Sequence, residues 1–507
     1  MTRLTSLAAL LLTCLLAAHA ETEAPVVMTG NGPVIGKSDA GIFAFLGIPY
    51  AAPTAGDRRW TAPQQPEGWD EVRPAQAYGP ACPQPVSQAV FLEDDSNQSE
   101  DCLSLNVWTP DTGAEDLPVM VWMHGGAFYL GAGGAPIYDG SALAREDVVV
   151  VTLNYRLGAL GFFGHPDLAE EQAGVPRANY GFLDQVAALE WVRDNIEAFG
   201  GDPDNVTLFG ESAGGVSVLL HLYSPLSEDL FDKAIIQSGG GWRPLSSAAD
   251  LDSEGAALAE SLGADSLAAL RNIPLPDLLS AQADSGTQWW PVVESNSVPM
   301  QIPAAVLNRK IADVPLMIGA NNWEASLARA RQIDAETIIS TVPEDMRNEA
   351  RKAYNADTLS DQQFADGLYT DAGFAAPARW VARQASKGNR AYLYRFEQVR
   401  EGLAGKVPGA AHGVDVVYVF GSVEHLASAA EFGETDKAMS DIMIDCWTGF
   451  AKVGKPECGT DWPDYAREAD KIMVFGNGEA SFEKNMQTER LNFQEALALR
   501  LASDSRR

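Results

Sequence analysis

The chain has 507 residues, of which 46% are hydrophobic and 21% are charged, and this composition is typical of a globular protein with a large core. Its charge is strongly acidic, with 36 Lys and Arg against 69 Asp and Glu and a formal net charge of −33. Such a field disfavours nucleic acid and anionic membranes as partners, although a solvated acidic surface is the simplest interpretation of it.

The first 20 residues have the features of a secretory signal peptide. Arg3 gives a positive start, residues 7–18 form an apolar run, and Ala18-His19-Ala20 offers a small-x-small cleavage pattern. The run is too short to span a membrane comfortably, and no later stretch is long and apolar enough to do so. We therefore expect an exported protein, periplasmic or secreted and soluble after cleavage, whose residues 21–507 form a single domain.

Four cysteines remain after cleavage of the signal, because Cys14 lies within it. An even number in a chain bound for an oxidising compartment favours disulfides, and three pairings are possible. The most local pairing joins Cys82 to Cys102, across a polar and acidic stretch, and Cys446 to Cys458. The helical spacing of apolar residues around Cys446 places it on a buried helix face, so an unpaired core cysteine is the alternative.

The strand-like runs begin in the first third of the chain. Residues 103–108 alternate apolar and polar side chains, and residues 119–123 are continuously apolar, as in a buried strand. A glycine-rich turn, His124-Gly125-Gly126-Ala127-Phe128, follows the second run directly. Such a turn lets backbone N–H groups approach a substrate oxygen, although an ordinary strand-to-helix turn would look the same.

The middle of the chain alternates strands with helices. Residues 148–153 and 233–237 are further buried-strand runs, and residues 184–197 have helical spacing. This alternation predicts the α/β class, with a central, mostly parallel sheet and helices on both of its faces.

A G-x-S-x-G motif, Gly210-Glu211-Ser212-Ala213-Gly214, stands between a β-branched apolar run at 206–209 and a helix-compatible run at 216–223. In a strand–turn–helix context this motif presents an exposed nucleophilic serine on a strained turn. The free N–H groups of the helix N-terminus suit a developing oxyanion. We therefore expect Ser212 to be a nucleophile, and the simpler alternative is a turn whose serine caps the helix.

A nucleophilic serine needs a histidine base, which follows it in the chain in this fold. Three of the six histidines precede the serine, and His221 lies in the helix directly after it. His425 lies in what resembles an exposed helical turn, whereas His412 lies in a loop of small residues before the apolar run 414–420. His412 is therefore the better base, although a solvated loop histidine is the alternative.

The acid that orients the base should follow a strand between the serine and the histidine. Residues 314–319 form an apolar run, and Glu324 comes shortly after it. Asp313 precedes the same run and so lies at its wrong end. Glu324 is our choice and Glu294 the second candidate, while a surface carboxylate is the simpler interpretation of Glu324.

Several segments together resemble the type-B carboxylesterase and cholinesterase-like family of α/β-hydrolases. The segment FGGDPDNVTLFGESAG is similar to the serine signature of that family, SEDCLSLNVWTP resembles its second signature, and VWMHGGAFYLGAG resembles another of its blocks. The resemblance extends from about residue 26 to the C-terminal helix. It implies the α/β-hydrolase fold, with helical and loop insertions over an active-site gorge.

The resemblance also implies roles for individual residues. Ser212 matches the nucleophile of the family, Glu324 its acid and His412 its base. The backbone N–H groups that match the oxyanion hole are those of Gly126, Ala127 and Ala213. Many members have a third glycine where Ala127 stands, so the carbonyl side of the pocket differs slightly here.

Residues 82–102 match the first disulfide loop of the family, which implies a Cys82–Cys102 bond. Cholinesterases carry a tryptophan in this loop that stacks on choline, whereas here its only aromatic residue is Phe91. This difference argues against cholinesterase activity.

The function we expect is that of an exported serine carboxylesterase. It would hydrolyse neutral small-molecule esters with short to medium acyl chains, without a metal or cofactor, while the sequence leaves its oligomeric state open. A lipase for longer acyl chains is one alternative, and a non-catalytic adhesion or scaffold module of the same fold is another. The candidates to line the substrate site, each of which could equally be core, are Trp242, Trp289, Trp290 and Phe374.

Overall fold

The fold is seen in a computed structural model, which describes residues 25–85, 97–425, 431–466 and 469–504. The expected signal peptide and Phe91 lie outside these ranges. Among the described residues, no helix combines the length and the apolar character that crossing a bilayer requires.

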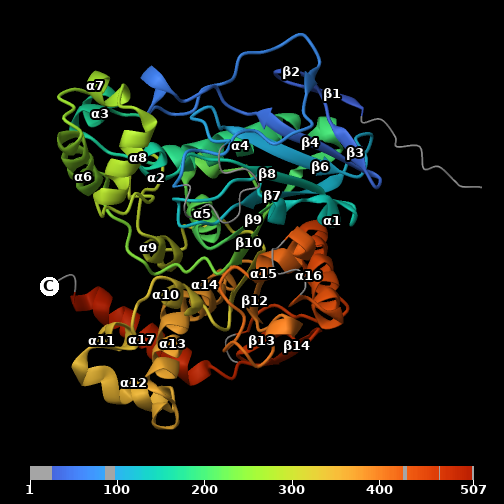
Figure 1. Cartoon of the computed structure of the whole chain (residues 1–507). Helices are drawn as coiled ribbons and strands as arrows, with labels where there is room; N and C mark the ends of the chain where they lie inside the picture. The colour runs from blue at the N-terminus through green and yellow to red at the C-terminus, as the bar shows by residue number, and fades with distance from the viewer. Residues whose placement is uncertain (1–24, 86–96, 426–430, 467–468, 505–507) are drawn as a thin grey trace, which may run out of the picture.

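A single large sheet runs through the molecule in the order β14-β13-β12-β11-β10-β9-β7-β8-β6-β4-β3 (Figure 1). Its strands from β8 and β7 through β13 pair in parallel, whereas β3, β4, β6 and β14 are joined antiparallel at the two edges. The strands are β3 (Lys37–Asp39), β4 (Ile42–Pro49), β6 (Ser104–Thr109), β7 (Leu117–Met123), β8 (Val149–Leu153), β9 (Gly201–Glu211), β10 (Lys233–Gln237), β11 (Leu316–Asn321), β12 (Ala391–Phe396), β13 (Lys471–Gly476) and β14 (Glu479–Lys484). A small second sheet holds β1 (Val26–Thr29), β2 (Gly32–Ile35) and β5 (Arg73–Pro74).

Helices occupy most of the connections between the strands. They are α1 (Ser141–Ala144), α2 (Gly158–Gly161), α3 (Pro166–Glu171), α4 (Tyr180–Asn195), α5 (Ala213–His221), α6 (Ala248–Ser261), α7 (Leu267–Arg271), α8 (Leu275–Asp284), α9 (Ile302–Leu307), α10 (Ser326–Ala330), α11 (Ala335–Ser340), α12 (Arg347–Ala353), α13 (Asp361–Thr370), α14 (Ala376–Ala385), α15 (Asp415–Val419), α16 (Glu434–Val453) and α17 (Thr488–Asp504). Figure 1 shows α6, α7 and α8 as one helical group at the upper left and α11, α12 and α13 as another at the lower left.

The central strands are buried on both faces, which explains their continuously apolar sequences. On β7, Val119 and Val121 belong to one hydrophobic cluster, while Met120 and Trp122 belong to a second cluster on the opposite face. Successive side chains of a strand point to opposite faces, so the sheet separates two cores. The fold class expected from the sequence, an α/β-hydrolase with a mostly parallel sheet between helices, is thereby confirmed.

The apolar run 414–420 differs from the strand runs in forming a helix, α15 (Asp415–Val419). It packs against α16, whose buried face carries Cys446 as the spacing of apolar residues predicts. Cys446 is nevertheless bonded to Cys458, and Cys82 is bonded to Cys102. The structure therefore contains the most local of the three pairings, and the core-cysteine alternative for Cys446 is wrong.

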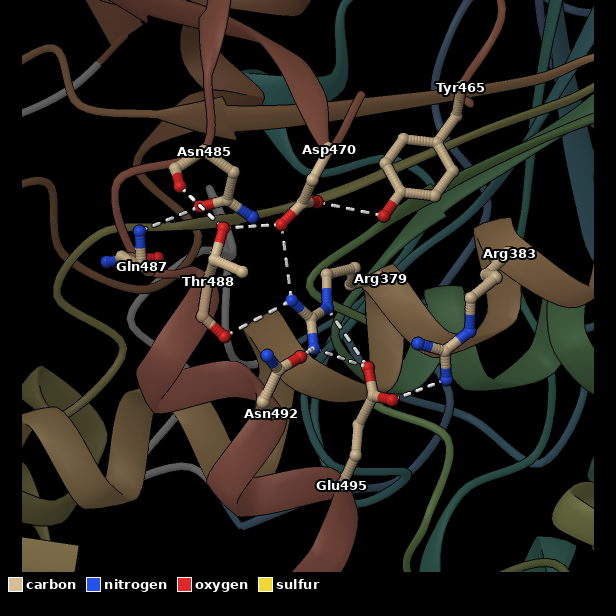
Figure 2. A network of polar contacts seen from close by, with 9 residues as sticks. All are labelled: Arg379, Arg383, Tyr465, Asp470, Asn485, Gln487, Thr488, Asn492 and Glu495. Atoms are coloured by element: carbon tan, nitrogen blue, oxygen red, sulfur yellow. Dashed lines mark hydrogen bonds and ion pairs between the residues drawn. The ribbon is translucent and has the colours of Figure 1, made fainter. Parts of the chain in front are cut away.

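The C-terminal helix α17 is tied to the rest of the fold by charged side chains (Figure 2). Arg379 of α14 donates to Glu495 of α17 at 2.8 Å and lies 3.4 Å from Asp470, which precedes β13. Arg383, one turn further along α14, also pairs with Glu495. We call these four residues the C-terminal anchor. A further residue of α17, Arg490, donates to the fully buried carboxylate of Asp371 at 2.8 Å.

Candidate active site

Ser212 stands between the end of β9 and the start of α5, as expected of a nucleophile on a strand–turn–helix. Its backbone has φ 54° and ψ −120°, a conformation that non-glycine residues rarely adopt and that costs conformational energy. Its N–H donates to the carbonyl of Gln237 on the neighbouring β10 at 2.9 Å. This turn leaves the Ser212 side chain partly exposed where its neighbours are buried.

The glycines of the motif are required by packing. A Cβ on Gly214 would lie 1.8 Å from the carbonyl oxygen of Met123, and one on Gly210 would lie 2.6 Å from the backbone of Gly214. Gly215, the next residue, would collide in the same way with the backbone of Gly239, at 2.8 Å. The strand and helix around Ser212 therefore approach more closely than any other residue type allows.

Glu324 and His412 come together although 88 residues separate them in the chain. Glu324 Oε2 accepts a hydrogen bond from His412 Nδ1 at 2.5 Å. Its other oxygen, Oε1, accepts from the Ser238 hydroxyl at 2.6 Å and from the Asn321 N–H at 2.7 Å. The carboxylate is completely buried, so it is held in one orientation behind the imidazole.

The second ring nitrogen of His412 lies next to the serine motif. His412 Nε2 is 3.1 Å from Oε1 of Glu211, the residue that precedes Ser212. Neither this contact nor any other gives His412 a hydrogen bond to the Ser212 hydroxyl within the described part of the chain. The structure thus joins the predicted base, His412, directly to the predicted acid, Glu324. On the serine side, the contact of His412 is with Glu211, the residue before the predicted nucleophile.

Three buried carboxylates surround the single imidazole. Burial lowers the pKa of His412, but the negative charges of Glu211, Glu324 and Asp415 outweigh it and raise that pKa above the ordinary value. Burial in turn raises the pKa of Glu211, an effect that His412 opposes and that Asp415 and Glu324 reinforce. The site therefore binds a proton more tightly than an isolated histidine does.

The glycine-rich turn after β7 lies against the serine. A Cβ on Gly125 would stand 3.3 Å from the Ser212 Cβ, so the turn lies against the residue of the predicted nucleophile. Gly126 and Ala127 both have positive φ, 105° and 56°. Within the described residues, the N–H groups of Gly126, Ala127 and Ala213 have no hydrogen-bond acceptor. These free donors have the character that an oxyanion hole requires.

Three other histidines lie in positions that do not suit a catalytic base. His124 and His221 are buried, and burial lowers the pKa of His124 to about 4 and that of His221 to about 3. His425 is exposed in a short helical turn, as expected. The second candidate acid, Glu294, accepts hydrogen bonds from the turn that includes Ser297 and has no contact with His412. His412 and Glu324 are thus the only predicted pair that meets among the described residues.

The four aromatic candidates for the substrate site separate into two kinds. Phe374, in a π-helical turn (Asp371–Ala375), packs its ring 5.2 Å from the His412 ring. The Trp290 ring packs 5.4 Å from the ring of Phe128, the last residue of the glycine-rich turn. Trp289 is completely buried and belongs to the core, and Trp242 packs against Trp380.

Two buried acids near His412 were not singled out from the sequence. Glu211 is the first variable position of the G-x-S-x-G motif, so the sequence already placed this acid next to the predicted nucleophile. Asp415 accepts from Gln237 at 2.7 Å and from Asn321 at 3.0 Å, and its closeness to His412 in the chain was the only signal. No group of three or more His, Cys, Asp or Glu side chains in the described ranges is arranged to hold a metal ion.

The sheet order, the serine turn and the Glu–His pair together define an α/β-hydrolase. The match of a model of the carboxylesterase family to residues 23–494 makes this class more specific. Para-nitrobenzyl esterase of Bacillus subtilis is 37% identical over 92% of this chain and 97% of its own length, and fumonisin B1 esterase of Sphingopyxis macrogoltabida is 36% identical over 92% and 89%. The solved structure of a thermophilic pNB esterase superposes with a TM-score of 0.82 at 36% identity, covering 92% of this chain and 99% of that one. The chain belongs to the carboxylesterase family and is a carboxylic ester hydrolase.

Proposed function

We propose that Ser212, His412 and Glu324 are the catalytic triad of this carboxylesterase, acting on small neutral esters. The observation that carries the proposal is the hydrogen bond from His412 Nδ1 to the buried Glu324, formed beside a serine on a strained turn. A base oriented by a buried acid and an exposed nucleophile at one strand end is what acyl transfer needs.

In the first half of the reaction, the Ser212 Oγ attacks the ester carbonyl while His412 Nε2 accepts its proton. Glu324 keeps the Nδ1 proton in place and stabilises the charged imidazole. The carbonyl oxygen becomes an oxyanion that the N–H groups of Gly126, Ala127 and Ala213 bind. The C–O bond to the alcohol then breaks, and the alcohol leaves with the proton from His412.

In the second half, water hydrolyses the acyl-enzyme. His412 accepts a proton from the water as its oxygen attacks the acyl carbonyl, and the same three N–H groups bind the second oxyanion. Ser212 then leaves and regains its proton from His412, which releases the carboxylic acid. The enzyme returns to its starting state without a cofactor.

Neutral esters with short to medium acyl chains are the substrates that the surroundings favour. The aromatic rings next to the site, Phe374 and Trp290, are apolar surfaces, and relatives of this chain are a para-nitrobenzyl esterase and a fumonisin B1 esterase. A choline group needs an aromatic face to stack on, and tryptophan is absent from the sequence between Cys82 and Cys102. We therefore propose that choline esters are poor substrates.

Export is the second part of the proposal. The signal-like sequence of residues 1–20 and two disulfides, Cys82–Cys102 and Cys446–Cys458, both fit an oxidising compartment. N-terminal sequencing of the secreted or periplasmic protein should give a mature chain that begins at Glu21. A cytosolic protein that retains Met1 would contradict export without affecting the triad.

An organophosphate probe tests the triad directly. It should label the wild-type protein at one peptide, the one that contains Ser212, and Ser212→Ala should abolish the label. His412→Ala should slow labelling strongly, whereas His425→Ala, which alters an exposed histidine, should label as the wild type does. Labelling of a different serine would show that another residue is the nucleophile.

Substrate choice is tested by kcat/KM for acetylthiocholine against a neutral thioester of similar size, at moderate salt. We expect the neutral thioester to be preferred. A preference of about tenfold or more for the cation, equivalent to about 1.4 kcal/mol of transition-state binding, would reveal a choline site.

A further inference from the structure

A pair of arginines near the candidate active site has no acidic partner. Arg243 lies in the loop after β10, and Arg331 directly follows α10. Neither guanidinium forms an ion pair or a side-chain hydrogen bond within the part of the chain that the structure describes. Arg329, two residues before Arg331, shows the more usual arrangement, because it pairs with Asp366 at 2.8 Å.

Arg243 is held in place by an aromatic ring. Its guanidinium carbon lies 3.9 Å from the centre of the Trp290 ring, which is a close cation–π contact. A guanidinium stacked in this way still presents its N–H groups at its edge, where they can bind a carboxylate through two hydrogen bonds. The side chain remains exposed to solvent, so an anion can reach it.

Two chains of contacts connect Arg243 to the reacting groups. Trp290, under the guanidinium, packs 5.4 Å from Phe128, the residue after the predicted oxyanion donor Ala127. In the second chain, a Cβ on Gly240 would stand 3.0 Å from the carbonyl oxygen of Gly373, so the Arg243 loop touches the π-helical turn. The next residue of that turn is Phe374, which packs against His412.

The electrostatic surroundings of Arg243 favour an anion. Partial shielding from solvent and the repulsion of Arg331 hold the pKa of Arg243 below its ordinary value, and Tyr369 acts in the opposite direction. The repulsion between these two arginines, neither of which forms an ion pair, favours a negative group that binds at Arg243. The net charge of −33 repels anions at longer range, so a local cationic site is the means by which this protein can bind one.

We propose that Arg243, supported by Arg331, forms an anion-binding subsite beside the active site, which selects esters that carry a free carboxylate away from the scissile bond. The inference rests on the proposed function, because it concerns the substrates of the same Ser212. Neutral esters remain substrates, and the carboxylate adds binding that they lack. The same cations also disfavour choline esters, whose charge has the opposite sign.

Matched pairs of esters test the subsite. One pair is p-nitrophenyl hemiglutarate and its methyl ester, which places the carboxylate on the acyl side. The other pair is the butyrate ester of 4-hydroxybenzoate and the butyrate ester of methyl 4-hydroxybenzoate, which places it on the alcohol side. In at least one pair, the wild type should favour the acid over its methyl ester by about tenfold in kcat/KM, equivalent to about 1.4 kcal/mol.

Variants then assign the preference to the two arginines. Arg243→Gln should remove the preference and leave kcat/KM for the methyl esters unchanged, and Arg243→Lys should keep part of it. Arg145→Gln is the control, because it removes the same charge from an exposed position at the end of α1. If Arg243→Gln also lost activity on the methyl esters, Arg331→Gln would be the deciding variant. It should weaken the preference for the acid and leave kcat/KM for the methyl esters at the wild-type value.

Two results would overturn the subsite. One is a wild type that favours neither acid, and the other is a preference that survives both Arg243→Gln and Arg331→Gln. Failure of the proposed function has a different signature, in which Ser212→Ala hydrolyses the methyl esters as well as the wild type does. Activity of Ser212→Ala on the methyl esters therefore tests the proposed function, whereas the preference for the acid over its methyl ester tests the subsite.

Discussion

Two groups of buried charged side chains differ in how their charges are balanced. The C-terminal anchor joins two guanidiniums, Arg379 and Arg383, to two carboxylates, Asp470 and Glu495 (Figure 2). The active-site group instead places the carboxylates of Glu211, Glu324 and Asp415 around the single imidazole of His412.

The difference indicates different roles. A balanced group in which every charge has a partner stabilises the packing of the elements that carry it, here α14 and α17. An unbalanced group costs folding energy because like charges repel in a buried site, and such groups are characteristic of sites that transfer protons. Variants in the two groups should therefore affect different properties.

The largest effect should come from removing the reacting groups of the unbalanced site. Ser212→Ala or His412→Ala should lower kcat/KM for p-nitrophenyl acetate by about 10⁴-fold or more, because each ends the transfer of a proton from the nucleophile. Glu324→Gln should retain more activity, since it alters only the orientation and stabilisation of the base. His425→Ala is the control and should be silent. A Ser212→Ala variant with near wild-type turnover would refute the triad.

The corresponding change in the balanced group should lower stability rather than activity. Arg379→Met removes a guanidinium that is only 3% exposed and leaves Asp470 and Glu495 short of a partner. We expect the free energy of unfolding to fall by about 3–5 kcal/mol, measured by urea denaturation.

Arg351→Gln provides the matched control for that measurement. Its ion pair with Asp357 is exposed, so its loss should cost about 0–1 kcal/mol. Equal losses for the two variants would show that burial of the anchor contributes nothing. The molecules of Arg379→Met that remain folded should hydrolyse esters at the wild-type rate.

The disulfide Cys82–Cys102 carries no charge, so its removal tests a contribution to stability that does not depend on electrostatics. The Cys82–Cys102 bond closes a loop with a sequence separation of 20, and replacing both cysteines by serine should cost about 3 kcal/mol, mainly by freeing the unfolded chain. Peptide mapping without reduction should first recover the two cysteines in one crosslinked species. Free thiols at both positions in the secreted protein would contradict the bond.

The smallest effect concerns proton affinity in the unbalanced group. The base must be neutral to accept a proton, so kcat/KM should fall as pH drops through the pKa of His412. The Glu211 carboxylate raises that pKa, and Glu211→Gln removes its charge. The acid limb of the pH profile should therefore move to lower pH by about one unit. Glu197→Gln, at an exposed position, should leave it in place.

An acid limb that stays in place, or moves to higher pH, in Glu211→Gln would show that this carboxylate does not control the base. The shift is independent of any change in the plateau rate, because it is read from the midpoint of the profile.

The sequence predicts the elements whose patterns are local. The runs at 119–123, 148–153 and 233–237 are strands, because continuous apolar sequence is what strands buried on both faces require. The turn around Ser212 was equally readable, since its glycines leave no room for a Cβ. Family resemblance, rather than periodicity, selected Gly126 and Ala127 as oxyanion donors.

Features that depend on distant contacts were not readable. The run at 414–420 is as apolar as a strand, yet it forms α15, because tertiary packing against α16 determines its conformation. Nothing near Arg243 in the chain shows that its guanidinium stacks on Trp290. The burial of Glu211 and Asp415 around His412 is likewise a property of the assembled fold, in which segments far apart in the chain meet.

The contact between Arg490 and Asp371 links the last helix to His412, the predicted base. Asp371 begins the π-helical turn that carries Phe374, and Phe374 packs on His412. Burial raises the pKa of Asp371, and the charge of Arg490 opposes that effect, so the guanidinium favours the ionised carboxylate at the start of the turn. Loss of α17 should therefore loosen the ring that packs on His412, although this helix contributes no atom to the proposed reaction.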